Sequence, residues 1–459
     1  MSPPRLSELP GSCFEGAIPS ALATCGLDGL PNATWLSHVH RVDARHVALS
    51  CQFFRKTSEN LANDPRAQLF IVDPHSCRQW RLDLRAVRRE TEGPMFEAIA
   101  KRIAAVAALT RTGDVFELKS ADVFEVMMIS EVEVQGAPSV PQPSTPLDAL
   151  AALARITEGI SACRGLEALV RSGLEFLTLH LRLETVSLYL ADESEKSLYA
   201  LASRGYPISG VGARIGYGVG LVGVAAAQRM PVRISDMARE LRYGRVVREQ
   251  VERASGKLER EVPLPGLEQV ASLLAVPLLL DGELFGVLST ESARRLAYDE
   301  RDVLLLQTAG QVLAQALART LERAKDGSSD DDAERDASAS QPPAASEPEP
   351  LRVRYYQADD SVFVDGEYLI KGLPGRILWL LLSLRQSDGR DSFSNRELRL
   401  HALLKLPAYK DNLEARLLML QRRLQDKQVA LRLHREQRGR LRLSCAQPVE
   451  LEHVADPSL

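Results

Sequence analysis

The chain has 459 residues, of which 45% are hydrophobic, and its formal net charge is −4. This length and apolar content suffice for two to four domain cores. The near-neutral balance gives no argument for nucleic-acid binding by the chain as a whole; only its last region does. The six cysteines have neither C-x-x-C spacing nor the density of a disulfide framework, so we expect no metal site and a reducing compartment.

The chain carries no recognisable targeting or membrane segment. The N-terminal residues lack the basic and apolar regions of a secretory signal. No run approaches the length of about 18 uninterrupted apolar residues that a membrane helix needs. We therefore expect a soluble, cytoplasmic protein without membrane contacts.

Alternating apolar residues dominate the first region, residues 8–135, and predict an all-β fold. An Asp28-Gly29 pair supplies the positive φ of a hairpin turn. The predicted strands are residues 21–25, 34–42, 46–51 and 67–72.

Two cations, Arg55 and Lys56, stand at a predicted helix start with Thr57 or Ser58 as N-cap. Cations at a helix N-terminus add to the positive end of the helix dipole and to its free N–H groups, which favours an anion site. The alternative interpretation is a solvated helix start. His38, His40 and His46 alternate along predicted strands; half-exposed polar positions explain them better than metal or haem ligands.

The segments 18–24, 28–31 and 46–57 resemble the pyridoxamine 5′-phosphate oxidase-like flavin split barrel. The resemblance implies an FMN cofactor, with the Arg-Lys pair on its phosphate and a strand hydroxyl near the flavin. The implied cofactor contacts are Ser50, Gln52, Arg55, Lys56 and Thr57.

The region departs from the vitamin-converting oxidases of this family at two cofactor-gripping positions. Thr34 and Val39 stand where those oxidases carry Arg and Lys, and their C-terminal substrate-binding segment has no counterpart. The resemblance therefore implies flavin binding, and no catalytic residue is assigned.

The second region, residues 147–322, mixes helices and strands. A helical pattern over 147–180 precedes strands at 185–190 and 197–203, an Asp281-Gly282 hairpin, and a closing helix at 299–319. Gly218, Gly220 and Gly223 match the G-x-G-x-x-G spacing of dinucleotide sites, but no buried strand precedes them. We interpret these glycines as a sharp turn into a helix at 221–228.

This region resembles a GAF domain, an α+β fold, over nearly its whole length. The resemblance implies a small-molecule cavity between the sheet and residues 217–268, which hold no cysteine for covalent bilin attachment. The charged residues 239–260 are expected to form a lid or a solvated helix. Helices 147–166 and 304–321 are expected to pack in a homodimer.

Residues 323–350 are acidic and rich in Ser, Pro and Ala, which predicts a disordered linker. Beyond it, residues 351–445 hold 19 Lys/Arg and 11 Asp/Glu. In this last module, residues 351–446, an Asp365-Gly366 turn predicts a hairpin. Three helices are predicted after it: one at 376–385, one that begins at the capping box of Ser394, and one at 411–427. A basic hairpin is predicted at 431–443.

Strands, three helices and a hairpin resemble the winged-helix output domain of response regulators, an α+β fold. In that family the third helix enters the DNA major groove and the hairpin touches the backbone. The implied DNA contacts are Asn412, Arg416, Arg422 and Arg423 on the helix and Arg435, Arg438 and Arg440 on the hairpin. The alternative is a basic protein-docking domain.

Together these patterns favour a multidomain sensory or transcriptional regulator that binds a flavin or another small ligand and acts through DNA. Two alternatives remain: an FMN-dependent oxidoreductase with a regulatory GAF domain, and a non-catalytic dimerisation scaffold. The identity of the GAF ligand is not encoded in any motif.

Overall fold

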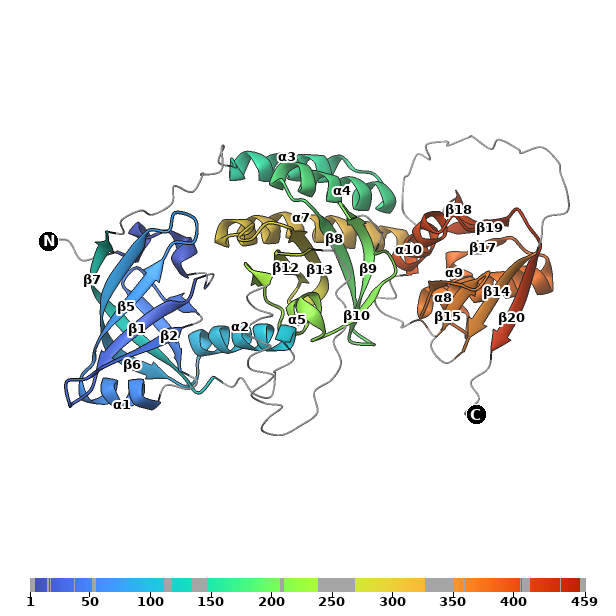
Figure 1. Cartoon of the computed structure of the whole chain (residues 1–459). Coiled ribbons are helices and arrows are strands. Elements are labelled where there is room, and N and C mark those ends of the chain that lie inside the picture. Colours follow the sequence, from blue (N-terminus) through green and yellow to red (C-terminus); the bar gives the residue numbers. More distant parts are fainter. Residues whose placement is uncertain are drawn as a thin grey trace. The chain divides into compact units, whose positions relative to one another are not determined.

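Figure 1 shows the computed structural model of the chain. The helix α7 ends at Asp326 and the next described residue is Pro350, so most of the expected linker lies outside the described set. Among the described residues no helix is long and apolar enough to cross a membrane. The structure describes residues 5–14, 16, 18–36, 38–51, 55–110, 118–133, 147–206, 210–237, 269–326, 350–357, 360–404, 406, 413–437 and 439–454.

Seven antiparallel strands form the first sheet, in the order β2-β1-β5-β6-β7-β4-β3. The sheet curls around its own core, as the split-barrel resemblance implies (Figure 1). The elements of this region are β1 (Ser20–Cys25), β2 (Pro31–Leu36), β3 (Val39–Arg41), β4 (His46–Cys51), α1 (Arg55–Asn63), β5 (Arg66–Val72), β6 (Gln79–Glu90), α2 (Pro94–Thr110) and β7 (Ser120–Val132).

The single strand predicted at residues 34–42 is wrong. Its first half belongs to β2, which pairs with β1, and its second half contains β3, which pairs with β4. These two strands stand at opposite ends of the sheet order. Alternation with a period of two shows which residues face the core, but it carries no information about the partner strand.

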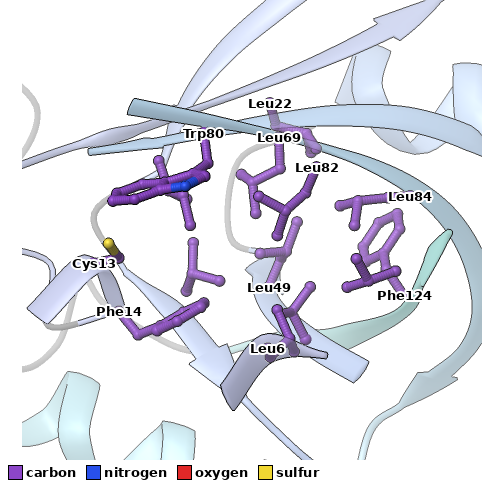
Figure 2. Packing of buried hydrophobic residues seen from close by; sticks show 14 of the residues in the cluster. Leu6, Cys13, Phe14, Leu22, Leu49, Leu69, Trp80, Leu82, Leu84 and Phe124 are labelled. Atoms are coloured by element: carbon purple, nitrogen blue, oxygen red, sulfur yellow. The ribbon is translucent and has the colours of Figure 1, made fainter. Parts of the chain in front are cut away.

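The core of this region gathers side chains from the strands and from two short 3₁₀ helices, η1 (Leu6–Glu8) and η2 (Gly11–Phe14). Figure 2 shows Leu6 and Phe14 lying against the same cluster as Trp80 and Phe124. Leu6 and Phe124 are fully buried. Full burial of one such side chain contributes about 1.5–3 kcal/mol, so the N-terminal segment stabilises the barrel.

A six-stranded sheet in the order β10-β9-β8-β13-β12-β11 forms the second region. The helix predicted over 147–180 is two helices, because Gly165 adopts a φ of +78° between them. The elements are α3 (Ala149–Ala162), α4 (Leu166–Leu181), β8 (Val186–Asp192), β9 (Ser197–Arg204), β10 (Arg214–Gly216), α5 (Gly220–Gln228), β11 (Val232–Ile234), β12 (Ser272–Leu280), β13 (Glu283–Ser292) and α7 (Glu300–Asp326).

Two predicted turns of this region are confirmed by their backbone angles. Gly218 and Gly220 have φ of +80° and +59°, which L side chains rarely adopt, and they lead directly into α5. Asp281 and Gly282 have φ of +51° and +79° between β12 and β13, as a type I′ hairpin requires.

The described residues of the last module form two sheets and three helices. One sheet has the order β16-β15-β14-β20, and the other has the order β17-β19-β18. The strand β20 lies past the expected limit at residue 446 and pairs in parallel with β14. The elements are β14 (Leu351–Tyr356), β15 (Ser361–Val364), β16 (Glu367–Ile370), α8 (Leu373–Asp388), β17 (Ser392–Ser394), α9 (Asn395–Leu400), α10 (Leu413–Asp426), β18 (Leu431–Gln437), β19 (Arg440–Cys445) and β20 (Val449–Val454).

Internal contacts divide the chain into two compact units, and the division runs through the six-stranded sheet. The second unit contains Leu153–Ile215, Leu278–Leu288 and Thr308–Leu459. It therefore holds β8 and β9 together with the whole last module.

A pair of aspartates caps the start of α7. Asp299 Oδ1 accepts from the N–H groups of Arg301 and Asp302, and Asp302 Oδ2 accepts from the Asp299 N–H at 2.8 Å. Burial, opposed by that N–H and reinforced by the Asp299 carboxylate, raises the pKa of Asp302 to about 6. The folded state thus binds this proton more tightly than the unfolded state, and stability falls as pH rises from about 4 to about 6.

We expect Asp302→Asn to remove this loss, because an amide can accept the same N–H bond without a charge. When the pH is raised from 4.5 to 6.5, the free energy of unfolding of the variant should increase by about 1–2 kcal/mol relative to that of the wild type. This figure allows for the partial solvation of Asp302. Urea unfolding at the two pH values measures the difference. Glu300→Gln, which changes an exposed carboxylate on the same turn, is the control; equal shifts in both variants would contradict the assignment.

Candidate functional site

The helix α1 begins at Arg55, earlier than the N-cap predicted at Thr57 or Ser58, and places Lys56 in its first turn with an exposed side chain. The side chain of Arg55 lies outside the described set. The first turn of a helix presents N–H groups without intrahelical partners, and an exposed ammonium adds positive charge there. This turn can therefore bind a phosphate or another anion.

Two hydrogen bonds, one part-buried and one buried, fix α1 on the sheet. Asn32 Nδ2 on β2 donates to Thr57 Oγ1 at 3.0 Å, and Asn60 Nδ2 on α1 donates to Thr24 Oγ1 on β1 at 3.1 Å. Thr57 is 4% exposed. The prediction of Thr57 or Ser58 as N-cap is wrong, because both residues lie inside a helix that begins at Arg55.

The remaining predicted flavin contacts are only partly described. Ser50 is half-buried on β4, opposite Ala121 of β7 in the strand register, and Gln52 lies outside the described residues. Lys56 and Ser50 fit a flavin phosphate and ring in chemical type, whereas the Thr57 hydroxyl already serves Asn32. The sequence analysis did not identify Asn32 and Asn60, whose side chains hold α1 on the sheet. The position of Asn60, three residues after Thr57 on a short helix, was the sequence signal that could have identified it.

The strand histidines make local contacts. His46 Nδ1 lies 2.8 Å from the Asp43 carboxylate, and the rings of His38 and His40 are 6.4 Å apart. Within the part of the chain that the structure describes, no three His, Cys, Asp or Glu side chains converge in a way that could hold a metal ion.

The GAF cavity was expected between the sheet and residues 217–268. Of these, residues 238–268, which include the expected lid at 239–260, lie outside the described set. Thr290, Tyr298 and Arg233 form a hydrogen-bonded group in the described part of this region. Thr290 Oγ1 lies 2.8 Å from the Tyr298 hydroxyl, and Arg233 Nη1 donates to the Tyr298 carbonyl oxygen at 3.1 Å. The sequence signal was the polar run Ser289 to Ser292 at the end of an apolar strand.

The expected DNA contacts on α10 are engaged within the protein, and Asn412 lies outside the described residues. Arg416 is 8% exposed and pairs with Asp192 at the end of β8, with Nη2 and Oδ2 2.5 Å apart. Arg422 points Nη1 at the Leu201 carbonyl oxygen, 3.5 Å away, and Arg423 Nε donates to the Leu369 carbonyl oxygen at 2.8 Å. Their role in DNA binding stays a prediction.

The hairpin β18–β19 carries the other expected contacts. Arg435 Nη2 lies 2.8 Å from Glu414 Oε2, whose carboxylate is buried and also accepts from Asn395 Nδ2. Arg440 is exposed at the start of β19, opposite Ser394 in the register. Arg438 lies outside the described residues. Arg440 is thus open to an external anion, while Arg435 holds the hairpin on α10.

Two family models match parts of the chain. The model for pyridoxamine 5′-phosphate oxidase matches residues 12–133, and the model for the GAF domain matches residues 163–318. No curated protein matches the chain significantly.

Solved structures similar to parts of the chain include free methionine-R-sulfoxide reductase from Neisseria meningitidis, at 20% identity and a TM-score of 0.31 over 39% of this chain and 96% of that one. The GAF domain of an Acinetobacter phosphoenolpyruvate-protein phosphotransferase has 22% identity and a TM-score of 0.30 over 37% and 92%. An FMN-binding protein from Syntrophomonas wolfei has 20% identity and a TM-score of 0.22 over 25% and 77%. At these values the likenesses carry no argument about ligand or reaction.

The family matches coincide with the first two regions of the fold. Residues 12–133 contain the curled antiparallel sheet, and residues 163–318 contain the six-stranded sheet with α4, α5 and most of α7. The chain is therefore a multidomain protein in which a pyridoxamine 5′-phosphate oxidase-like split barrel is followed by a GAF domain, an architecture of ligand-binding regulatory or flavin-related proteins.

Proposed function

We propose that this protein is a sensory regulator that binds FMN in its split barrel and a small molecule in its GAF domain, and that its last module binds DNA. The observation that carries the proposal is the order of elements after residue 350. Three helices, α8, α9 and α10, precede a hairpin whose strands share a sheet with the short strand β17. This order supports a winged helix, in which the third helix would read the major groove.

The flavin part of the proposal rests on the family match and on the first turn of α1. Lys56, with Arg55 beside it, would hold the phosphate, and Ser50 would lie near the ring. FMN would supply redox chemistry or a redox-sensitive signal there. The chain's own residues would bind and orient it, and α1 is held rigidly enough for this by the two bonds to β1 and β2.

A second candidate function is an FMN-dependent oxidoreductase, favoured by the family match over residues 12–133. Turnover of reduced nicotinamide or pyridoxamine phosphate by flavin-loaded protein would support this candidate over the regulator. Flavin retention without turnover would support sensing.

Arg55→Ala combined with Lys56→Ala should weaken FMN binding by about a hundredfold or more, because a hydrogen bond to a charged group contributes about 1.5–3 kcal/mol. Titration of apoprotein with FMN, followed by quenching of flavin fluorescence, measures the dissociation constant. Arg66→Ala combined with Lys101→Ala removes two other cations of the same domain and should leave it unchanged. Equal affinity in wild type and the first variant would refute the phosphate site.

Arg440→Ala should weaken binding of random-sequence duplex DNA uniformly and lower the slope of log K against log salt by about one, as expected when one phosphate contact is lost. Electrophoretic retardation by the full chain at low and rising salt measures both. Arg352→Ala, which changes an arginine paired with Glu450 on the other sheet, is the matched control. An unchanged affinity and slope in the Arg440 variant would remove Arg440 from the proposed phosphate contacts.

A further inference from the structure

The first two turns of α10 are enclosed on every side. All eight side chains from Leu413 to Leu420 are buried, including those of Glu414 and Arg416. Successive helical residues point about 100° apart, so eight of them cover the full circumference. These first two turns therefore have no face free to enter a DNA groove.

Part of the enclosure comes from the GAF domain. The helix α10 contacts β9, which belongs to the same compact unit. Arg416 pairs with Asp192, and its guanidinium lies 4.7 Å from the centre of the Tyr199 ring. The side chains of Arg416 and Asp192 are only 10% and 12% exposed.

Further contacts extend this docked surface. Arg422 reaches the Leu201 carbonyl oxygen on β9, and the Glu167 carboxylate on α4 lies close enough to interact with it electrostatically. A Cβ built on Gly212, in the turn before β10, would lie 3.7 Å from the Ile370 side chain. Burial lowers the pKa of Arg422, so this guanidinium is also withdrawn from water.

We propose that the Asp192–Arg416 pair is a latch by which the GAF domain holds α10 closed and withholds it from nucleic acid. The masking of DNA binding rests on the function proposed above, whereas the latch itself does not. Asp192 and Tyr199 lie on adjacent strands of the GAF sheet, so any change in that sheet alters both sides of the Arg416 contact together.

The chemistry of the latch favours release over permanent docking. A buried ion pair gains little over an apolar contact of the same size, because both charges lose their hydration. Arg416 Nε is buried without a hydrogen-bond partner among the described residues, so the docked state leaves one donor unsatisfied. Although burial opposes its ionisation, hydrogen bonding from Ser194 and the charge of Arg416 lower the pKa of Asp192.

Amide hydrogen exchange in the full chain tests the latch without DNA. Asp192→Asn keeps the shape of the side chain and removes its charge, and it should speed exchange in α10 and β9 together by about tenfold or more, a coupling of ordinary size. The control is Glu193→Gln, which neutralises the next carboxylate in the sequence. Glu193 Oε2 lies 2.6 Å from Lys196 Nζ at the surface. Unchanged exchange in α10 of the Asp192 variant would overturn the latch.

The double variant Asp192→Leu with Arg416→Met provides a second measure. Two apolar side chains of similar length should keep α10 docked, so its exchange should return to the wild-type rate or fall below it. Exchange that stays fast in the double variant would contradict a role for this contact in docking.

Binding of random duplex DNA at low salt then tests the masking. Asp192→Asn should bind about tenfold more tightly or better than wild type and the Glu193→Gln control. Equal affinity of an opened variant and the wild type would overturn masking. If the variant opens by exchange and neither protein binds DNA, the latch stands and the proposed DNA-binding function fails.

Discussion

Two opposite charges, Glu414 and Arg416, are buried two positions apart on α10, and neither is stable away from water without a partner. Glu414 finds its partners inside the last module, on α9 and β18. Arg416 finds its partner outside the module, on the GAF strand β8. This single constraint fixes the hairpin on the helix and the helix on the neighbouring domain.

In the split barrel, the residues that hold α1 on the sheet differ from the residue that is free to bind an anion. The buried polar groups of α1 are satisfied by neutral bonds to β1 and β2, whereas Lys56 remains exposed in the first turn. Because the supporting groups are not the charged ones, an anion can enter or leave that turn without unseating the helix. The basic module has the opposite arrangement, since cations on α10 are themselves used for support.

Elements governed by local chemistry could be predicted from the sequence. The Asp-Gly turns at Asp281 and Asp365 have the expected positive φ, and Ser394 Oγ accepts from the Glu397 N–H at 3.1 Å, as a capping box requires. The strand break between β2 and β3 was not predictable, because strand partners are set by contacts distant in sequence. The helix break at Gly165 was missed because apolar spacing continues across it.

The sequence by itself determined three regions, the two ligand-binding domain types among them, and the position of the cation-rich helices, since each depends on composition and short-range spacing. Only the tertiary structure decided which cations are available. Arg416 and Arg440 are equally basic in the sequence, yet one is buried against Asp192 and the other is open to solvent. The reason is that a charge's availability depends on desolvation and on partners supplied by distant strands, neither of which residue type records.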